Sequence, residues 1–196
     1  MTLTIIGPVR TRTSRVLWCL EELGLAYDHV EHRPHSPEVT ALNPLKQVPI
    51  LLDGDAVITD STAMLHYLAD RAGRLTFAPG TPSRALLDAR INFALTELDA
   101  PLWLKSRHAY VLPEELRNPA AGAVAQSDFA LNIAKFDALL GDAEYFAGPD
   151  FTIADIVATH CLTWATGVGW DLPDRTAAYR DRMIARPAWA RSRKGQ

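Results

Sequence analysis

The sequence predicts an α/β domain followed by an all-helical domain. Up to residue 73, short β-branched runs alternate with segments of helical periodicity in the order βαβ, then α, then ββα. The run Pro79-Gly80-Thr81-Pro82 then interrupts regular structure, and no strand pattern follows it. We therefore divide the chain into an α/β domain over residues 1–74, a linker over residues 75–82 and an all-helical domain over residues 83–196.

The α/β domain begins with three elements. Residues 2–6 are short and β-branched and end at a Gly-Pro pair, which predicts a buried strand. Residues 14–24 repeat apolar side chains at helical spacing, with hydroxyl residues at the start and a glycine at the end, which predicts a helix. Residues 27–32 are predicted to form the second strand.

Turn chemistry predicts the rest of this domain. A short helix is expected over residues 36–42, ahead of an Asn-Pro pair. Residues 48–52 and 56–59 are strand-like and flank an Asp-Gly-Asp sequence. Because Asp-Gly is a strong hairpin signal, these two strands should pair antiparallel. A helix over residues 60–73 completes the domain.

The second domain contains only helical patterns. Its predicted helices are residues 83–112, 120–140, 153–164 and 173–185. Pro101 should kink or break the first of them. Thr152 and Asp155 have the spacing of a capping box just ahead of the third helix, so we interpret this pair as a folding device.

The composition excludes several classes of protein. With 20 Lys and Arg against 23 Asp and Glu, the net charge of −3 argues against a nucleic-acid partner. No apolar run approaches the roughly 18 residues of a membrane span, and no signal-peptide pattern is present, so we expect the cytoplasm. The 2 cysteines have no CxxC spacing, so neither a disulfide framework nor a structural metal site is expected.

Four motifs in order resemble the cytosolic glutathione transferase superfamily, in its bacterial type. The motifs are GPVRTRTSRVLWCLEELGL at residues 7–25, NPLKQVP at 43–49, ITDSTAM followed by YLAD within 58–70, and YFAGPDFTIAD at 145–155, with Arg186-Pro187-Ala188 as the usual ending. The resemblance spans nearly the whole chain. It implies a thioredoxin-like βαβαββα domain that binds glutathione, followed by the all-helical domain.

The resemblance also implies a function. We expect a homodimeric, cytoplasmic glutathione transferase of the detoxification type, which adds the glutathione thiolate to a small hydrophobic electrophile and uses no metal. The alternatives with the same fold are a glutathione-dependent peroxidase, disulfide reductase or isomerase. A non-catalytic binding protein that has lost the glutathione site is the alternative from another class.

Thr11 is the predicted catalytic residue. The thiol of glutathione has an ordinary pKa of about 8.5, and the thiolate is the nucleophile, so the enzyme must lower this pKa. One hydroxyl that donates to the sulfur contributes about 1.5–3 kcal/mol, enough to bring the pKa close to 7. Members with a similar basic-hydroxyl-basic loop have the catalytic hydroxyl at Thr11. A more general alignment of the family places it on Arg10, and a capping role is the alternative for Thr11 and Thr13.

Three arginines, Arg10, Arg12 and Arg15, lie near the start of the first predicted helix. Cations are disfavoured at a helix N-terminus, so the cluster indicates an anion site. We predict that Arg10 or Arg12 compensates the charge of an anionic cofactor or substrate. Exposed surface charges are the alternative interpretation.

The resemblance assigns further glutathione contacts to the segment before Pro49. Val48, ahead of a cis Pro49, pairs with the cysteinyl unit of glutathione, and Gln47 reaches its glycyl carboxylate. Lys46 stands where members often have Gly, so it either assists at that carboxylate or is exposed.

Asp60 and Ser61 open the last helix of the α/β domain. The free N–H groups of this helix can hold the γ-glutamyl carboxylate, while the Asp60 side chain takes the ammonium group. Asp replaces the commoner Glu, which shortens the reach by one methylene. A helix cap alone is the alternative for this pair.

The electrophile pocket is expected between the two domains. Its predicted lining from the long helix is Trp103, Arg107, His108 and Tyr110. Core packing is the alternative for these aromatic side chains. His29 and His32 should lie on opposite faces of a strand, which argues against a metal site, and Cys19 is predicted to be a packed thiol.

Overall fold

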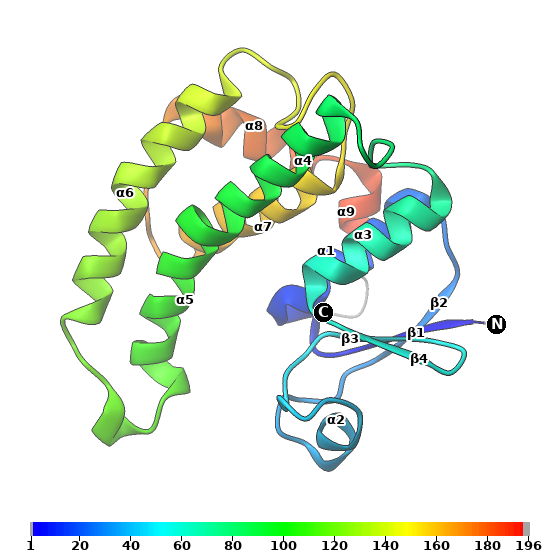
Figure 1. Ribbon diagram of the computed structural model, residues 1–196. Coiled ribbons are helices and arrows are strands. Elements are labelled where there is room, and N and C mark those ends of the chain that lie inside the picture. The colour runs from blue at the N-terminus through cyan, green and yellow to red at the C-terminus, as the bar shows by residue number, and fades with distance from the viewer. Residues whose placement is uncertain (1, 194–196) are drawn as a thin grey trace. The chain divides into compact units, whose positions relative to one another are not determined.

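The computed structural model describes residues 2–193, which form two compact units (Figure 1). One unit comprises the chain up to Pro79 together with the segment from Ile184, and the other is Gly80–Met183. The first contains a four-stranded sheet and the second is helical, so the predicted fold class, α/β followed by all-α, is confirmed. The domain limits 1–74, 75–82 and 83–196 stay a prediction.

The sheet of the first unit has the strand order β2-β1-β3-β4. β1 (Leu3–Ile6) pairs parallel with β2 (Tyr27–Val30) and antiparallel with β3 (Ile50–Asp53). β3 pairs antiparallel with β4 (Ala56–Thr59), with Asp53 opposite Ala56, so the predicted hairpin is confirmed.

Two predicted strands differ from the structure by two residues at one end. β2 ends at Val30 instead of residue 32, because its partner β1 ends at Ile6 and the following Gly7-Pro8 leaves the sheet. The last bond there runs from the Gly7 N–H to the Val30 carbonyl, at 2.9 Å. β3 begins at Ile50 instead of residue 48, because Pro49 has no N–H to donate to a neighbouring strand.

Helices cover both faces of this sheet. Figure 1 shows α1 (Ser14–Leu23) and α3 (Ser61–Ala72) on one face and α2 (Pro37–Leu42) on the other. Val39 of α2 packs on Ile6 and Ile50 in one buried cluster. Each aliphatic side chain buried in this way stabilises the unit by about 1.5–3 kcal/mol. The βαβαββα order with this layering is the thioredoxin-like arrangement.

The C-terminal helix α9 (Pro187–Arg191) packs against α1, which explains why the chain from residue 184 groups with the first unit. The rings of Trp189 and Trp18 meet edge to face, with centroids 4.8 Å apart. Arg186 forms a bidentate ion pair with Glu22, at 2.6 Å from Nε to Oε1 and 2.9 Å from Nη2 to Oε2. This contact joins residues that are far apart in the sequence.

The second unit is a helical bundle. Its elements are α4 (Pro82–Phe93), η2 (Ala94–Asp99), α5 (Ala100–Ser106), η3 (Arg107–Val111), η4 (Glu114–Leu116), α6 (Ala121–Leu140), α7 (Ile153–Gly167) and α8 (Asp174–Ile184). The helix predicted over residues 83–112 is interrupted by two wide turns, η2 and η3. Pro101 lies in the first turn of α5, directly after η2, where its missing N–H disturbs the helix least.

Asp155 joins three segments of this bundle. Its Oδ2 accepts from the Thr152 N–H at 2.8 Å, while Oδ1 accepts from the Phe146 N–H and the Tyr179 hydroxyl, both at 2.7 Å. Burial raises the pKa of Asp155, although its hydrogen bonds oppose that shift. The capping box is present, so its interpretation as a folding device is confirmed.

Candidate functional site

The candidate site begins at the loop between β1 and α1. There η1 (Val9–Thr13) forms one irregular turn in which Thr11 has an extended backbone, with φ −113° and ψ −171°. The turn is closed by the Thr11 N–H, which donates to the Pro8 carbonyl at 3.1 Å. Thr13, two residues further along the chain, is the N-cap residue of α1.

The Thr11 hydroxyl is half-buried and makes several local hydrogen bonds. It donates to the Pro8 carbonyl at 2.8 Å and accepts from the Thr13 N–H at 3.2 Å. A third contact joins it to the Thr13 hydroxyl, also at 2.8 Å. The hydroxyl predicted to be catalytic is therefore held at the start of α1, where the helix dipole favours an anion.

The β1–α1 loop meets the segment before β3 at Gly7. A Cβ atom added to Gly7 would lie 2.4 Å from Thr13 Oγ1 and 2.8 Å from Val48 Cβ, so only glycine fits between these two side chains. The Val48-Pro49 peptide bond is cis, as the resemblance implies. The structure thus brings Thr11, Thr13 and Val48 into one neighbourhood.

Asn43 holds the segment that contains Lys46 and Gln47. This side chain is buried; its Nδ2 donates to the Gln47 carbonyl and its Oδ1 accepts from the Leu45 N–H, both at 3.0 Å. Lys46 has a φ of +58° and, like Gln47, is exposed. We did not predict a role for Asn43, although its place before Pro44 is a turn signal.

Asp60 is the N-cap of α3. Its Oδ1 accepts from the Thr62 N–H at 2.8 Å and from the Ala63 N–H at 3.0 Å. Two of the helix N–H groups that we reserved for a carboxylate are thus taken by the cap. The Ser61 N–H and the Asp60 Oδ2 take part in neither bond.

The three arginines of the first loop and helix differ in their surroundings. Arg10 is exposed, in line with a surface charge, and Arg12 is half-buried. Arg15 is buried, and its Nη1 lies 3.5 Å from Oγ of the buried Ser61. For Arg15 the alternative of an exposed surface charge is therefore wrong. A guanidinium is always charged, so Arg15 adds a positive charge beside the start of α3 that we did not include in the predicted site.

The four residues predicted to line the electrophile pocket belong to the helical unit. Trp103 is half-buried on α5, whereas Arg107 and Tyr110 on η3 are exposed. His108 is half-buried, and its Nδ1 accepts from the Asn118 N–H at 3.1 Å.

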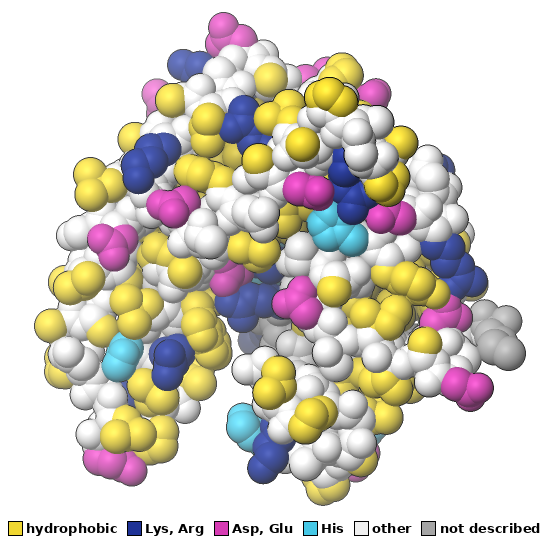
Figure 2. Space-filling view, viewed as in Figure 1, with side chains coloured by type: hydrophobic (Ala, Val, Ile, Leu, Met, Phe, Trp, Pro, Cys, Tyr) yellow, Lys and Arg dark blue, Asp and Glu magenta, His cyan; other side chains and the backbone are white. Residues whose placement is uncertain are grey.

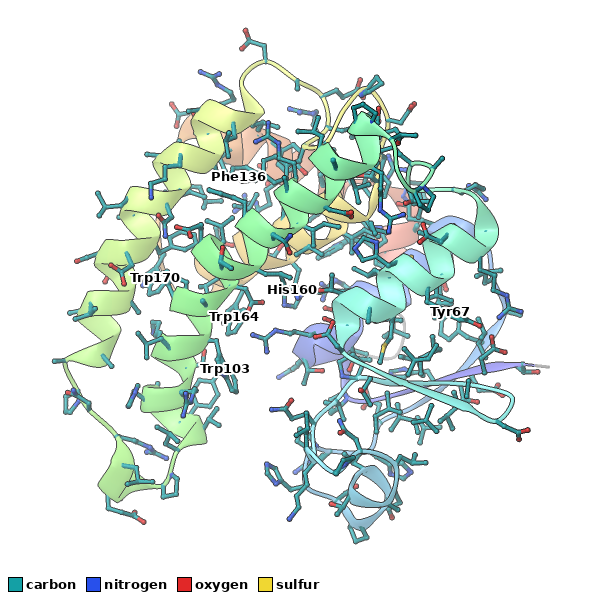
Figure 3. The ribbon with its side chains drawn as sticks, viewed as in Figure 1. Tyr67, Trp103, Phe136, His160, Trp164 and Trp170 are labelled. Atoms are coloured by element: carbon teal, nitrogen blue, oxygen red, sulfur yellow. The ribbon has the colours of Figure 1, made fainter. Side chains whose placement is uncertain are left out.

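Two further aromatic side chains of the helical unit stand outside the buried core. Figure 3 labels His160 and Trp164 on α7, whose rings are 6.1 Å apart. Both are half-buried, whereas Cys161 between them is completely buried. The helical periodicity that predicts this helix does not separate its core positions from these edge positions.

Cys19 and His29 both lie in the first unit. Cys19 is completely buried, and burial raises the pKa of its thiol far above the ordinary value, so the predicted packed thiol is confirmed. His29 Nε2 lies 2.8 Å from the Gly7 carbonyl oxygen. Across residues 2–193, no three His, Cys, Asp or Glu side chains converge to hold a metal ion, and no helix has the length and hydropathy to span a membrane.

Two family models match most of the chain. The model described as "Glutathione S-transferase, N-terminal domain" matches residues 11–71, and the one described as "Glutathione S-transferase, C-terminal domain" matches residues 103–191. Glutathione S-transferase 3 of Zea mays is 31% identical over 208 residues, which cover 93% of this chain and 84% of the maize protein. The stringent starvation protein A homolog of Coxiella burnetii is 24% identical over 173 residues, which cover 87% of this chain and 79% of that protein.

Solved structures agree with the sequence matches. The theta class glutathione S-transferase of Xanthomonas axonopodis pv. citri, crystallised with glutathione bound, superposes with a TM-score of 0.84 at 27% identity. The superposition covers 97% of this chain and 96% of the Xanthomonas chain. The chain belongs to the glutathione S-transferase superfamily.

Proposed function

We propose that the protein is a glutathione transferase whose Thr11 hydroxyl stabilises the thiolate of bound glutathione. One observation supports this proposal above the others: the Thr11 hydroxyl contacts Thr13 at the start of α1, and Thr13 and Val48 both lie against Gly7. The Xanthomonas relative, which carries glutathione in its crystal structure, extends over nearly the same length of chain. The maize relative bears the name of the same activity.

The ends of glutathione have charged partners in the first unit. The γ-glutamyl ammonium group binds the Asp60 carboxylate, whose Oδ2 the helix cap does not use. The γ-glutamyl carboxylate takes the Ser61 N–H and hydroxyl, with the buried charge of Arg15 behind Ser61.

The cysteinyl and glycyl units bind the segment that Asn43 holds. Val48 pairs with the cysteinyl backbone, and Gln47 with Lys46 receives the glycyl carboxylate. Arg10 and Arg12 add positive charge to the loop between β1 and α1. This charge favours the binding of an anionic ligand such as glutathione.

Thiolate formation follows from one hydrogen bond. In the free protein the Thr11 hydroxyl donates to the Pro8 carbonyl, which also accepts from the Thr11 N–H. Because that carbonyl keeps a second donor, the hydroxyl can turn to the sulfur at little cost. A hydrogen bond to a charged acceptor contributes about 1.5–3 kcal/mol, which lowers the thiol pKa by about one to two units. The thiol proton leaves to solvent. The sulfur then forms a C–S bond with the electrophilic carbon, and with an aryl halide the carbon–halogen bond breaks and halide leaves.

The second substrate is a small hydrophobic electrophile. Trp103 from α5 and His108 from η3 are half-buried members of the predicted lining, and His160 and Trp164 of α7 add two further half-buried rings in the helical unit. Arg107, His108 and Tyr110 complete the proposed lining. Flat apolar surfaces of this kind suit aromatic substrates, because stacked rings bury large apolar areas.

We also propose a homodimer that acts in the cytoplasm, as membership of this family implies. Hydrophobic side chains reach the surface along α6 (Figure 2), among them Val124 at 54% and Leu131 at 68% exposure. A charged residue at such a position should dissociate a dimer that uses this face. Light scattering on Leu131→Glu, compared with the wild type, measures that change.

The experiment that tests the proposed activity compares Thr11→Val with Thr11→Ser and with Thr40→Val on the exposed surface of α2. The assay is conjugation of glutathione to a 1-halo-2,4-dinitrobenzene at pH 6.5. Thr11→Val should lose about 10- to 100-fold in kcat, and the other two variants should keep the wild-type rate within about threefold. Equal rates in all four proteins would remove Thr11 from the mechanism.

A non-catalytic binding protein is the second candidate function. It is favoured by the likeness to the stringent starvation protein A homolog, whose name states no transferase activity. Calorimetric titration separates the two functions: the enzyme should bind glutathione at sub-millimolar to millimolar concentrations, whereas a protein that has lost the site should show no heat of binding.

A further inference from the structure

Thr13 carries a buried hydroxyl that the proposed mechanism does not use. The residue is 0% exposed, and its Oγ1 lies 2.8 Å from Oγ1 of Thr11. Thr13 is also the N-cap residue of α1, yet its side chain makes no capping hydrogen bond to that helix. A buried hydroxyl must find a partner within the protein, and here the partner is the hydroxyl of Thr11.

The direction of this hydrogen bond follows from proton counting. A hydroxyl has one proton and two lone pairs. The Thr11 proton points to the Pro8 carbonyl, so the Thr13 hydroxyl is the donor in the Thr11–Thr13 pair. The Thr13 N–H donates to the same Thr11 oxygen at 3.2 Å. The Thr13 hydroxyl and N–H thus occupy both lone pairs of Thr11 Oγ1. The Thr11 hydroxyl can then bind a further group only by donating its single proton.

The packing around Thr13 keeps its hydroxyl in this position. The space where a Cβ of Gly7 would stand is bounded by Thr13 Oγ1 at 2.4 Å and by Val48 Cβ at 2.8 Å. Gly7 is itself fixed by two hydrogen bonds, from its N–H to Val30 and between its carbonyl and His29. The buried Thr13 hydroxyl therefore lies directly against Gly7.

We propose that Thr13 is a positioning residue for the reaction, which acts through Thr11. Its hydroxyl and N–H hold the Thr11 oxygen as an acceptor and so direct the Thr11 proton to the sulfur of glutathione. The chain of hydrogen bonds from Thr13 to Thr11 to the sulfur polarises the middle hydroxyl and strengthens its bond to the thiolate. No proton moves along this chain; both hydroxyls keep theirs. This inference rests on the proposed glutathione transferase activity.

The test is the pKa of the glutathione thiol in the complex, read from the ultraviolet absorbance of the thiolate across pH. Thr13→Ala removes the hydroxyl without adding volume beside Gly7, and Thr13→Ser restores it. In Thr13→Ala the pKa of the bound thiol should rise by about half a unit to one unit, with kcat at pH 6.5 about three- to tenfold lower. The KM for glutathione should stay within about twofold, because the Thr13 hydroxyl is completely buried and acts through Thr11.

A double variant separates positioning from a merely structural role. In a Thr11→Val background, Thr13→Ala should leave the pKa of the bound thiol unchanged, because the residue through which Thr13 acts is gone. An unchanged thiol pKa in folded Thr13→Ala, or an equal shift in the Thr11→Val background, would overturn the inference. Wild-type protein that binds glutathione and lowers its thiol pKa supports the proposed function, whatever the Thr13 variants show. Failure of the proposed function is therefore distinguishable from failure of the positioning role of Thr13.

Discussion

Gly7→Ala should be the most damaging change of a single methyl group in the first unit. The new Cβ would meet Thr13 Oγ1 at 2.4 Å and Val48 Cβ at 2.8 Å, and Gly7 has a φ of +138°, which L-residues rarely adopt. Thr13 is completely buried and cannot move aside. Overpacking of this kind costs about 1–3 kcal/mol, and the unfavourable backbone conformation costs about as much again.

These contributions add to about 2–6 kcal/mol, which corresponds to a fall in melting temperature of about 4–24 °C for a chain of this length. Gly73→Ala is the matched control: Gly73 also has a positive φ, +61°, but a Cβ there would have no neighbour within 4 Å. The control should lose about 1 kcal/mol, or about 2–4 °C. Far-UV circular dichroism during heating measures both. Equal losses in the two variants would refute the contact of Gly7 with Thr13 and Val48.

Three further changes test other parts of the structure. Asp155→Ala removes the acceptor of four buried donors and should cost at least about 3 kcal/mol in urea denaturation. Asp142→Ala on the surface should cost less than about 0.5 kcal/mol. Arg186→Ala removes the bidentate ion pair with Glu22 and should cost about 1–3 kcal/mol. Arg180, which pairs with the next residue, is the control, and Arg180→Ala should cost less than about 0.5 kcal/mol. Equal costs would contradict a stabilising contact between α9 and α1. Asp60→Asn keeps an oxygen for the helix cap, so the free energy of unfolding should stay the same. The Kd for glutathione, measured by calorimetry, should rise about tenfold because the carboxylate that binds the ammonium group is gone. An unchanged Kd would restrict Asp60 to capping.

Local sequence rules predicted the elements whose stability is local. The β3–β4 hairpin follows from its Asp-Gly turn, and the start of α7 follows from the spacing of Thr152 and Asp155. The packing of α9 on α1 did not follow, because the Arg186–Glu22 pair joins residues at opposite ends of the chain. No pattern within a short window contains that contact.

The candidate site likewise combines features that are local in the sequence with contacts between distant residues. Loop position and hydroxyl chemistry pointed to Thr11, but the burial of Thr13 depends on Gly7 and Val48, which only the folded chain brings together. Arg15 shows the limit of charge patterning: three arginines near one helix start look alike in the sequence, yet one is buried beside Ser61 and another is exposed. Net charge carried no information on either position.

The most direct test of the proposed mechanism is a pH titration of glutathione bound to the wild type and to Thr11→Val. The thiolate absorbance should give a bound thiol pKa about one to two units below that of free glutathione in the wild type. In Thr11→Val the value should return most of the way to that of the free thiol. A wild-type complex whose thiol titrates like free glutathione, or a Thr11→Val complex that titrates like the wild type, would contradict a thiolate held by the Thr11 hydroxyl.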